Sequence, residues 1–173
     1  MAPLEIALPT RRATRRLGAA LGAALAPGDL VVLEGGLGAG KTFLVRAVAR
    51  ALGVPAEVPV TSPTFALVHE LPARVPLVHS DLYRLVSADE LVELGLVERV
   101  GHDAVVLIEW GERFLPSLGR DGLLVRLEVD ALAGRRATIA PIGPRGAALI
   151  EALAGAVTVT AATHPPRGVR RHV

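Results

Sequence analysis

The stretch LVVLEGGLGAGKTFLVRAVARAL, residues 30–52, decides the fold of this chain of 173 residues. It begins with an unbroken apolar run, Leu30–Leu33, which is typical of a central strand buried on both faces of a parallel sheet. Glycines follow, and apolar residues then recur at helical intervals from Thr42 to Leu52, before Gly53 and Pro55 end the helix. The stretch therefore predicts a buried strand, a glycine-rich loop and an amphipathic helix in direct succession.

The glycine-rich loop matches the phosphate-binding pattern G-x-x-x-x-G-K-[ST], and it lies between a strand and a helix, as that motif requires. Glycines allow backbone N–H groups to close around phosphate oxygens at the positive end of the following helix. Lys41 would reach the β- and γ-phosphates, and the hydroxyl of Thr42 would bind Mg²⁺. The motif predicts ATP and Mg²⁺ as ligands, with nucleotide contacts from Gly35, Gly38, Ala39, Gly40, Lys41, Thr42 and Phe43.

Lys41 is the only lysine among the 19 basic residues, and the others are all arginines. The abundance of arginine, alanine, glycine and proline indicates codon bias toward GC-rich DNA. Such bias replaces lysine with arginine on the surface, but the wide planar fork of arginine would not fit where a lysine reaches into a phosphate loop. The one remaining lysine therefore supports a phosphate-binding role for Lys41.

Two carboxylates are candidates for the metal and for catalysis. Glu109 directly follows the apolar run Ala104–Ile108, so it projects from the carboxyl end of a buried strand, where open α/β sheets bind ligands. Asp81 follows a shorter strand, Leu77–His79. Either carboxylate could hold Mg²⁺ or orient the attacking water, and the spacing does not assign the two roles.

The rest of the chain predicts an α/β domain over residues 1–154. Expected elements are an amphipathic helix from Thr10 to Pro27, a strand at Phe65–Leu71, a short helix at Ala88–Leu96 capped by Ser87, a hairpin of Leu123–Val129 with Arg136–Ile142, and a helix at Ala147–Leu153. Glu5–Leu8 is a short apolar run. From Gly155 onward the amphipathic period is lost, so residues 155–173 are expected to form a disordered basic tail.

Composition narrows the possible classes of protein. The 51% share of hydrophobic residues suffices for a sizeable core, and the absence of cysteine excludes disulfides and thiolate metal sites. The five histidines are too scattered for a metal-ligand pattern. A net charge of +2 does not by itself argue for nucleic-acid binding. Because no long apolar run or signal peptide is present, we expect a cytoplasmic protein without membrane contact.

At this point the motifs are recognisable as a set. The chain resembles the bacterial tRNA threonylcarbamoyladenosine biosynthesis ATPase family, the TsaE (YjeE) type, over roughly residues 10 to 142. The likeness rests on TRRLG (14–18), GDLVVLEGGLGAGKT (28–42), TSPTF (61–65), HSDLYRL (79–85), ELGLVE (93–98) and LIEWGERF (107–114). The chain departs from the family at Gly36, where an aspartate is usual, and at Gly111, where a proline is usual.

The resemblance implies a P-loop NTPase with a central mixed, mostly parallel sheet flanked by helices. It implies an ATPase subunit that supports multiple turnover of two partner proteins of the glycoprotease-like fold, with tRNA contacted indirectly. It also implies site roles: Thr42 and Glu109 as magnesium ligands, Lys41, Asp81 and Glu109 as catalytic groups, Ser62, Pro63, Thr64 and Phe65 as a switch loop, and Thr14 and Arg136 as further nucleotide contacts. Trp110 would lie beside the nucleotide or the partner surface, although a tryptophan at the end of a strand is often a core residue.

Three other functions compete with this one. A GTPase is disfavoured because guanine selection in that class uses an N-K-x-D segment, and the only lysine is already in the phosphate loop. In a small-molecule kinase, Asp81 would be the base for a substrate hydroxyl and Arg84 a substrate clamp. A nucleotide-dependent binding switch would order Ser62–Phe65 when ATP is present, with negligible hydrolysis. The kinase and the switch both stay open at the level of the sequence.

Overall fold

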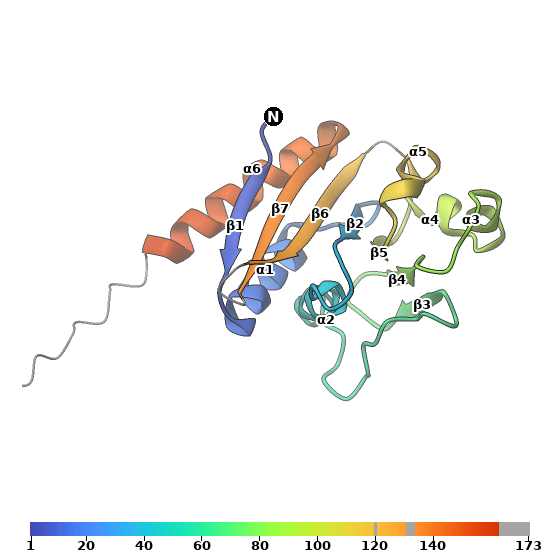
Figure 1. Ribbon diagram of the computed structural model, residues 1–173, viewed down its shortest axis with the longest axis horizontal. Helices are drawn as coiled ribbons and strands as arrows, with labels where there is room; N and C mark the ends of the chain where they lie inside the picture. The colour runs from blue at the N-terminus through green and yellow to red at the C-terminus, as the bar shows by residue number, and fades with distance from the viewer. Residues whose placement is uncertain (120, 131–133, 163–173) are drawn as a thin grey trace, which may run out of the picture.

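The computed structural model describes residues 1–119, 121–130 and 134–162. They form a seven-stranded sheet in the order β1-β7-β6-β2-β5-β4-β3, with helices on both faces (Figure 1). The strands are β1 (Leu4–Leu8), β2 (Leu30–Glu34), β3 (Val68–Leu71), β4 (Leu77–Asp81), β5 (Val105–Glu109), β6 (Gly122–Val129) and β7 (Arg135–Ile142). The helices are α1 (Arg11–Ala24), α2 (Lys41–Ala51), α3 (Asp89–Glu93), α4 (Leu96–Arg99), the 3₁₀ turn η1 (Glu112–Phe114), α5 (Leu115–Leu118) and α6 (Gly143–Ala162).

The direction of the strands confirms the expected mixed, mostly parallel sheet. Neighbouring strands β6, β2, β5 and β4 are mutually parallel, and β1 points the same way because it is antiparallel to β7, which is antiparallel to β6. Only β7 and β3 run in the opposite direction within the described residues. The carboxyl ends of β1, β2, β4, β5 and β6 therefore meet at one edge of the sheet, which is where open α/β sheets bind ligands.

Alternate residues of the central strands supply two apolar cores. Val31 and Leu33 of β2 pack with α1, α2 and α6 on one face of the sheet. Leu30 and Val32 pack on the opposite face with α3, α4 and α5. Because both faces of β2 are covered, every position of the strand favours an apolar residue, which explains the unbroken run in the sequence.

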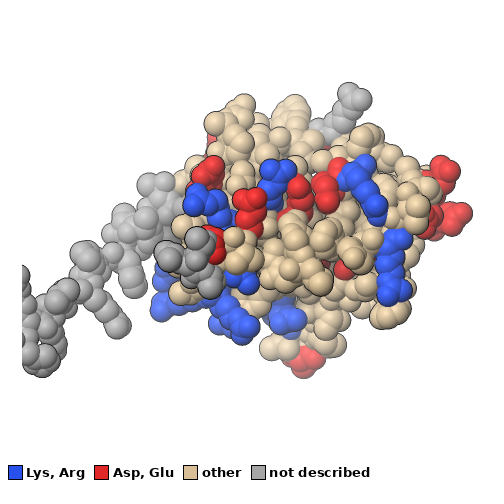
Figure 2. Space-filling model, in the orientation of Figure 1, with Lys and Arg blue, Asp and Glu red and all other residues tan. Residues whose placement is uncertain are grey.

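The sheet is less covered over β6 and β7. There the outward side chains are charged and pair across strands, as Arg126 does with Glu34 and Arg136 with Glu5. Figure 2 shows acidic and basic side chains interspersed over this face. This face is thus a solvated surface, and the apolar faces of β6 and β7 are covered by α6 on the opposite side.

Helices α1 and α2 pack closely through small residues. A Cβ atom added at Gly18 would lie 2.3 Å from the Cβ of Ala47, and one at Gly22 would lie 2.5 Å from the Cβ of Ala51. Thr10 caps α1, with its hydroxyl accepting the N–H of Ala13 at 3.2 Å. This contact fixes the start of α1 beside the glycine-rich loop that precedes α2.

Strand β1 is visible in the sequence only as an apolar run. In the structure it pairs with β7, with Leu4 opposite Ile139 and Leu8 opposite Arg135. This pairing joins segments that are far apart in the chain, so no local sequence pattern predicts it. It carries the chain to the ligand-binding edge of the sheet just before α1 begins.

Three local predictions were wrong. The strand expected from Phe65 begins only at Val68, because Leu67 has a left-handed backbone with φ of 64° that breaks the extended run. Ser87 does not cap α3, which begins after Ala88 with no side-chain cap. Instead the Glu90 carboxylate accepts the N–H groups of Val86 and Ser87, which is one half of a capping box.

The third concerns helix α6, which is longer than the sequence indicates. It continues to Ala162, past Gly155, where the tail was expected to start. Residues 155–162 combine three alanines, which have the highest helix propensity, with four β-branched valines and threonines, so propensity alone does not account for this extension. The rest of the predicted tail, residues 163–173, lies outside the described residues. Across the described part of the chain, no helix has the length and apolarity to cross a membrane.

Candidate functional site

The loop between β2 and α2 closes around Lys41. The ammonium group of Lys41 donates to the carbonyl oxygens of Gly35 at 2.6 Å and Gly36 at 3.1 Å. Gly35 has a φ of 139°, and a Cβ atom there would lie 2.3 Å from the carbonyl oxygen of Leu127, so only glycine fits. Gly40, with φ of 106°, makes the left-handed turn into α2. The loop thus presents the amino end of α2, which favours an anion.

Lys41 is buried among acidic and aromatic side chains. Burial lowers the pKa of the Lys41 ammonium from its ordinary value of 10.5, and the nearby carboxylates of Glu109, Asp81 and Glu112 oppose that lowering. Because desolvation of the ammonium is the larger effect, this cation lacks full compensation by the protein. An incoming phosphate would supply the missing negative charge.

The aromatic ring of Trp110 covers Lys41. Trp110 follows β5 directly and has a left-handed φ of 62°. Its backbone N–H donates to the carbonyl of Leu33 at 3.0 Å. Its ring also lies against that of Tyr83, with centroids 5.1 Å apart and planes inclined at 56°. The structure thus places the ring of Trp110 beside the phosphate loop.

Glu109, at the end of β5, links the loop to β4. Its Oε2 atom accepts the Thr42 hydroxyl at 2.9 Å, and its Oε1 atom lies 3.0 Å from Nε2 of His79. Glu109 is only 2% exposed and His79 is fully buried. The pairing of β2 with β5 brings this carboxylate beside the loop, since Leu33 is the register partner of Glu109. The sequence-based placement of Glu109 is therefore correct in space.

Asp81 is the neighbour of Glu109 across β4 and β5. Its Oδ1 atom accepts the N–H of Tyr83 at 3.0 Å. Its Oδ2 atom accepts hydroxyl hydrogen bonds from Ser62 and, at 3.4 Å, from Thr64. The expected switch loop, Ser62–Phe65, is thus tied to one of the two candidate carboxylates.

The remaining residues of that loop differ in exposure. Pro63 is buried, and its carbonyl accepts the N–H of Leu67 at 2.6 Å. Phe65 is 86% exposed, and the guanidinium of Arg84 lies over its ring at 4.6 Å. The loop is therefore anchored at Ser62–Thr64 and projects an aromatic side chain into solvent.

These groups surround a cavity of about 440 Å³. The structure brings together both carboxylates, the loop lysine, the threonine hydroxyl and the switch-loop hydroxyls that the sequence singled out. The cavity is lined by Leu37, Gly38, Gly40, Lys41, Thr42, Ser62, Thr64, Asp81, Tyr83, Glu109 and Trp110.

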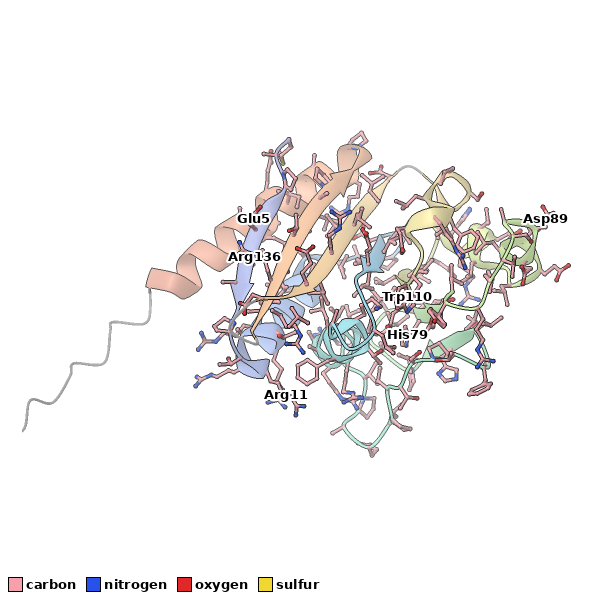
Figure 3. All side chains as sticks on the ribbon, in the orientation of Figure 1. Glu5, Arg11, His79, Asp89, Trp110 and Arg136 are labelled. Atoms are coloured by element: carbon pink, nitrogen blue, oxygen red, sulfur yellow. The ribbon has the colours of Figure 1, made fainter. Side chains whose placement is uncertain are left out.

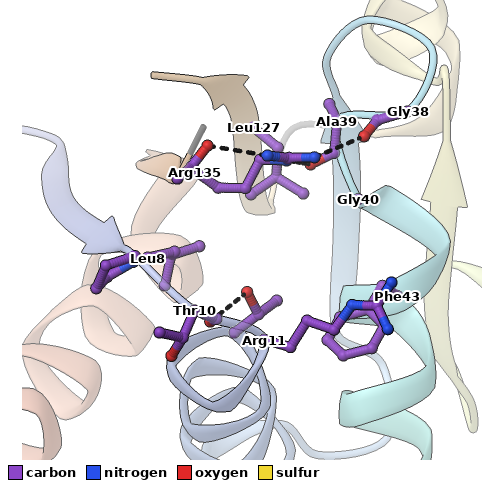
Figure 4. Close-up of a pocket in the computed structure, with 12 residues that line it drawn as sticks. Leu8, Thr10, Arg11, Gly38, Ala39, Gly40, Phe43, Leu127 and Arg135 are labelled. Carbon is purple, nitrogen blue, oxygen red and sulfur yellow. Dashed lines mark hydrogen bonds between the residues drawn. The ribbon is translucent and has the colours of Figure 1, made fainter. Parts of the chain in front are cut away.

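A second pocket, of about 470 Å³, shares Gly38 and Gly40 of the loop with the first cavity (Figure 4). Thr14, 6% exposed, lines it from α1, and Gly38, Ala39, Gly40 and Phe43 line it from the loop and α2. All five are residues for which the sequence predicts nucleotide contacts. The Arg11 guanidinium lies over the Phe43 ring at 5.8 Å. Because Gly38 and Gly40 line both pockets, a ligand that spans the two would pass along the loop.

Arg136 does not reach either of these two pockets. It pairs with Glu5 on the solvated face of the sheet, with Nη1 and Oε2 3.3 Å apart (Figure 3). Its neighbour Arg135 lines the second pocket instead, and its guanidinium donates to the carbonyls of Ala39 at 3.1 Å and Gly38 at 3.3 Å. Successive residues of a strand point to opposite faces of the sheet, so Arg135 and Arg136 lie on different faces. A sequence-based assignment that is shifted by one position therefore selects Arg136 in place of Arg135.

The oxygen atoms of this site suit Mg²⁺. Thr42 Oγ1 and Glu109 Oε2 lie within 2.9 Å of each other, and both are hard oxygen donors. Among the described residues, no group of three or more histidine, cysteine, aspartate or glutamate side chains could hold a metal ion. Mg²⁺ takes few protein ligands and completes its shell with water and phosphate oxygens.

Sequence reasoning missed two residues of the site. It selects Arg136 rather than its neighbour Arg135, and it treats His79 only as part of a strand. A signal for His79 exists, because a histidine inside an apolar strand two residues before a candidate carboxylate is a polar group that needs a buried partner. Which partner it finds depends on strand order, which the local pattern does not contain.

Comparison with known proteins agrees with this geometry. The family model of threonylcarbamoyl adenosine biosynthesis protein TsaE matches residues 8–137. A tRNA threonylcarbamoyladenosine biosynthesis protein TsaE from Treponema pallidum is 40% identical over 127 residues, which are 73% of this chain and 93% of that protein. The protein of the same name from Streptomyces coelicolor is 41% identical over 152 residues, 82% of this chain and 99% of that one.

The fold has a counterpart among solved structures. The crystal structure of Bacillus subtilis YdiB superposes with a TM-score of 0.73 at 27% sequence identity, and the match covers 90% of this chain and 97% of that one. The matched range of the family, residues 8–137, includes the phosphate loop, both carboxylates and the switch loop. The chain therefore belongs to the TsaE family of threonylcarbamoyl adenosine biosynthesis proteins.

Proposed function

We propose that the protein is the ATPase subunit of the machinery that makes tRNA threonylcarbamoyladenosine. One observation carries the proposal: Lys41, Thr42, Asp81 and Glu109 line a single cavity at the carboxyl edge of parallel strands. In a P-loop enzyme these residue types bind the phosphates, the metal and the attacking water. The names of the relatives support the pathway, and the proposal places the chain in the cytoplasm.

The residues of the site divide the work of phosphoryl transfer. Lys41 and the loop amides would stabilise negative charge on the transferred group, because preorganised donors in a water-poor site favour the transition state. Thr42 and Glu109 would hold Mg²⁺, which supplies charge neutralisation on the phosphates when bound. Asp81 is the candidate to position water, since two hydroxyls and one N–H already orient its oxygen atoms.

The cavity lining also supports dependence on partner proteins. Among the described residues that line the 440 Å³ cavity, none is an arginine. In other P-loop enzymes an arginine supplied in trans raises turnover by a factor of roughly 10³–10⁵. We propose that hydrolysis is slow in the isolated chain and is completed by two partner proteins of the glycoprotease-like fold, with tRNA contacted through them.

Reconstitution of tRNA modification tests the proposal. The unaltered chain, Lys41→Ala, Glu109→Ala and the control Arg136→Ala are each combined with the two partners, tRNA and ATP. We expect the first two variants to lose multiple-turnover modification and the control to retain it, because Arg136 lies outside both pockets. Retained turnover in Lys41→Ala would contradict the proposal.

Single-turnover hydrolysis separates the rival functions. Release of free phosphate that accelerates when the partners are added supports an ATPase. Binding of ATP without phosphate release, with or without partners, supports a nucleotide-dependent switch instead. Transfer of phosphate to a small metabolite would identify a kinase.

A further inference from the structure

We propose that His79 is a positioning residue for Glu109, holding one carboxylate oxygen so that the other alone faces the phosphate loop. The inference rests on the function proposed above and concerns the same site. It assigns different tasks to the two oxygen atoms of Glu109. Oε1 is the anchored atom, and Oε2 is the atom available for metal or water.

The hydrogen bonds around Glu109 define the proton positions. Oε2 accepts the hydroxyl proton of Thr42 at 2.9 Å, and Oε1 lies 3.0 Å from Nε2 of His79. An ionised carboxylate only accepts hydrogen bonds, so Nε2 of His79 carries the proton that it donates to Oε1. The contact therefore has one direction, from β4 to β5, and it approaches the carboxylate from the side of the buried histidine.

The surroundings of His79 argue against a purely structural role. The side chain is fully buried, and within the described residues its Nδ1 atom has no hydrogen-bond partner. A buried polar atom left without a partner is unfavourable, so packing alone would not call for a histidine at this position. A leucine would fill much of the same volume, but it would leave Oε1 of Glu109 without its partner. What a leucine cannot provide is the N–H group that reaches Oε1.

Without that N–H group, Glu109 has a competing attraction. The Lys41 ammonium lies close enough for Glu109 to be the first of the carboxylates that oppose the lowering of its pKa. A carboxylate released from His79 can rotate about its last bond and direct an oxygen toward Lys41. The terminal torsion of glutamate is broad, so such rotation meets little resistance. His79 therefore keeps Glu109 and Lys41 as separate groups for separate ligands.

Two variants distinguish positioning from packing. His79→Leu keeps most of the volume and removes the donor, while His79→Gln keeps an N–H group at a similar reach. The matched control is His69→Leu, because His69 is the register partner of His79 on β3 and is only partly buried. For each protein we would measure ATP affinity by calorimetry with Mg²⁺ and with a chelator, and the unfolding temperature without nucleotide.

The expected result is a loss that is larger in the presence of Mg²⁺ than in the chelator. In His79→Leu the enhancement of ATP affinity by Mg²⁺ should fall by roughly 10- to 100-fold, as for other residues that orient a metal ligand, and affinity in the chelator should fall by a smaller factor because Glu109 then competes for Lys41. Its unfolding temperature should fall, because the buried Oε1 atom of Glu109 loses its hydrogen-bond partner. His79→Gln should recover most of the enhancement, and His69→Leu should behave as the unaltered chain does.

Two results would overturn the positioning role: full enhancement by Mg²⁺ in His79→Leu, or a loss of that enhancement in His79→Gln as large as the loss in His79→Leu. A different pattern marks failure of the proposed function. In that case the unaltered chain itself would show no ATP binding, or no effect of Mg²⁺, before any change at His79 is made.

Discussion

The ammonium group of Lys41 lies 3.6 Å from the centre of the Trp110 ring. A cation over an indole face is attracted by the electrons of the ring, and burial strengthens that attraction. The same ammonium is the group that the proposed function assigns to phosphate. Trp110 is the only tryptophan in the chain, so tryptophan fluorescence of this protein reflects the surroundings of Trp110 alone.

Binding of ATP should therefore change the fluorescence of Trp110, because the ammonium that now faces the ring would turn toward phosphate oxygens. The measurement is a titration of tryptophan emission with ATP and Mg²⁺. In Lys41→Met the change should disappear. Arg84→Met, which removes a cation from the exposed ring of Phe65, is the matched control and should respond as the unaltered chain does. An unchanged response in Lys41→Met would refute this link.

Arg135 and Arg136 should differ in their effect on nucleotide affinity. Arg135 holds two carbonyls of the phosphate loop, at Gly38 and Ala39, and lines the second pocket. Removing a charged donor to two carbonyls in Arg135→Met should weaken ATP binding about tenfold, equivalent to about 1.4 kcal/mol. Arg136→Met removes only an exposed ion pair with Glu5 and should leave affinity unchanged. Calorimetry measures the ATP affinity of both variants. Equal losses of affinity would contradict the assignment of Arg135, rather than Arg136, to the nucleotide site.

Two glycines in helices should respond oppositely to alanine. Alanine in a helix is favoured over glycine by about 1 kcal/mol. At Gly155 of α6 an added Cβ meets nothing within 4 Å, so Gly155→Ala should stabilise the fold by about 0.5–1 kcal/mol. At Gly18 it would lie 2.3 Å from the Cβ of Ala47, so Gly18→Ala should destabilise it by about 1–3 kcal/mol. Urea unfolding measures the free energy of unfolding of both variants. Stabilisation by Gly18→Ala would show that α1 and α2 can move apart without a loss of stability.

The charge on Lys41 should make stability depend on alkaline pH. Burial lowers the pKa of Lys41 below 10.5 in the folded chain, so the unfolded chain binds more protons between the lowered pKa and 10.5. The free energy of unfolding should rise with pH across this window and level off above it. Lys41→Met lacks the titrating ammonium group. As the pH rises through this window, the free energy of unfolding of the unaltered chain should therefore increase relative to that of Lys41→Met. A difference that stays constant with pH would contradict the lowered pKa.

The features predictable from sequence are those set by local pattern and by one general rule of sheet geometry. The run at Leu30–Leu33 and the helix after Lys41 are local, and both are found in the structure. Glu109 was placed correctly because buried parallel strands end at a common edge, whichever strand is the neighbour. The loop motif and that rule together were enough to name most of the groups in the first cavity.

The features that the sequence did not reveal depend on register between distant segments. The contact between His79 and Glu109 requires β4 to lie beside β5, and the pairing of Leu4 with Ile139 joins the two ends of the domain. The choice between Arg135 and Arg136 depends on which residue of β7 faces α1, and a shift of one position reverses it. No pattern within a single segment contains this information.

The charged and hydroxyl side chains that the proposed function uses in the first cavity are each engaged with a partner from the chain itself. Glu109 accepts a hydrogen bond from Thr42, and Asp81 accepts hydrogen bonds from Ser62 and Thr64. Lys41 donates to carbonyl oxygens of the loop. An incoming anion would therefore enter by exchange, displacing internal partners rather than meeting bare charges. Its affinity would reflect the strength of its own hydrogen bonds minus that of the internal ones it replaces. A crowded site of this kind binds more weakly, and releases more readily, than its number of polar groups suggests.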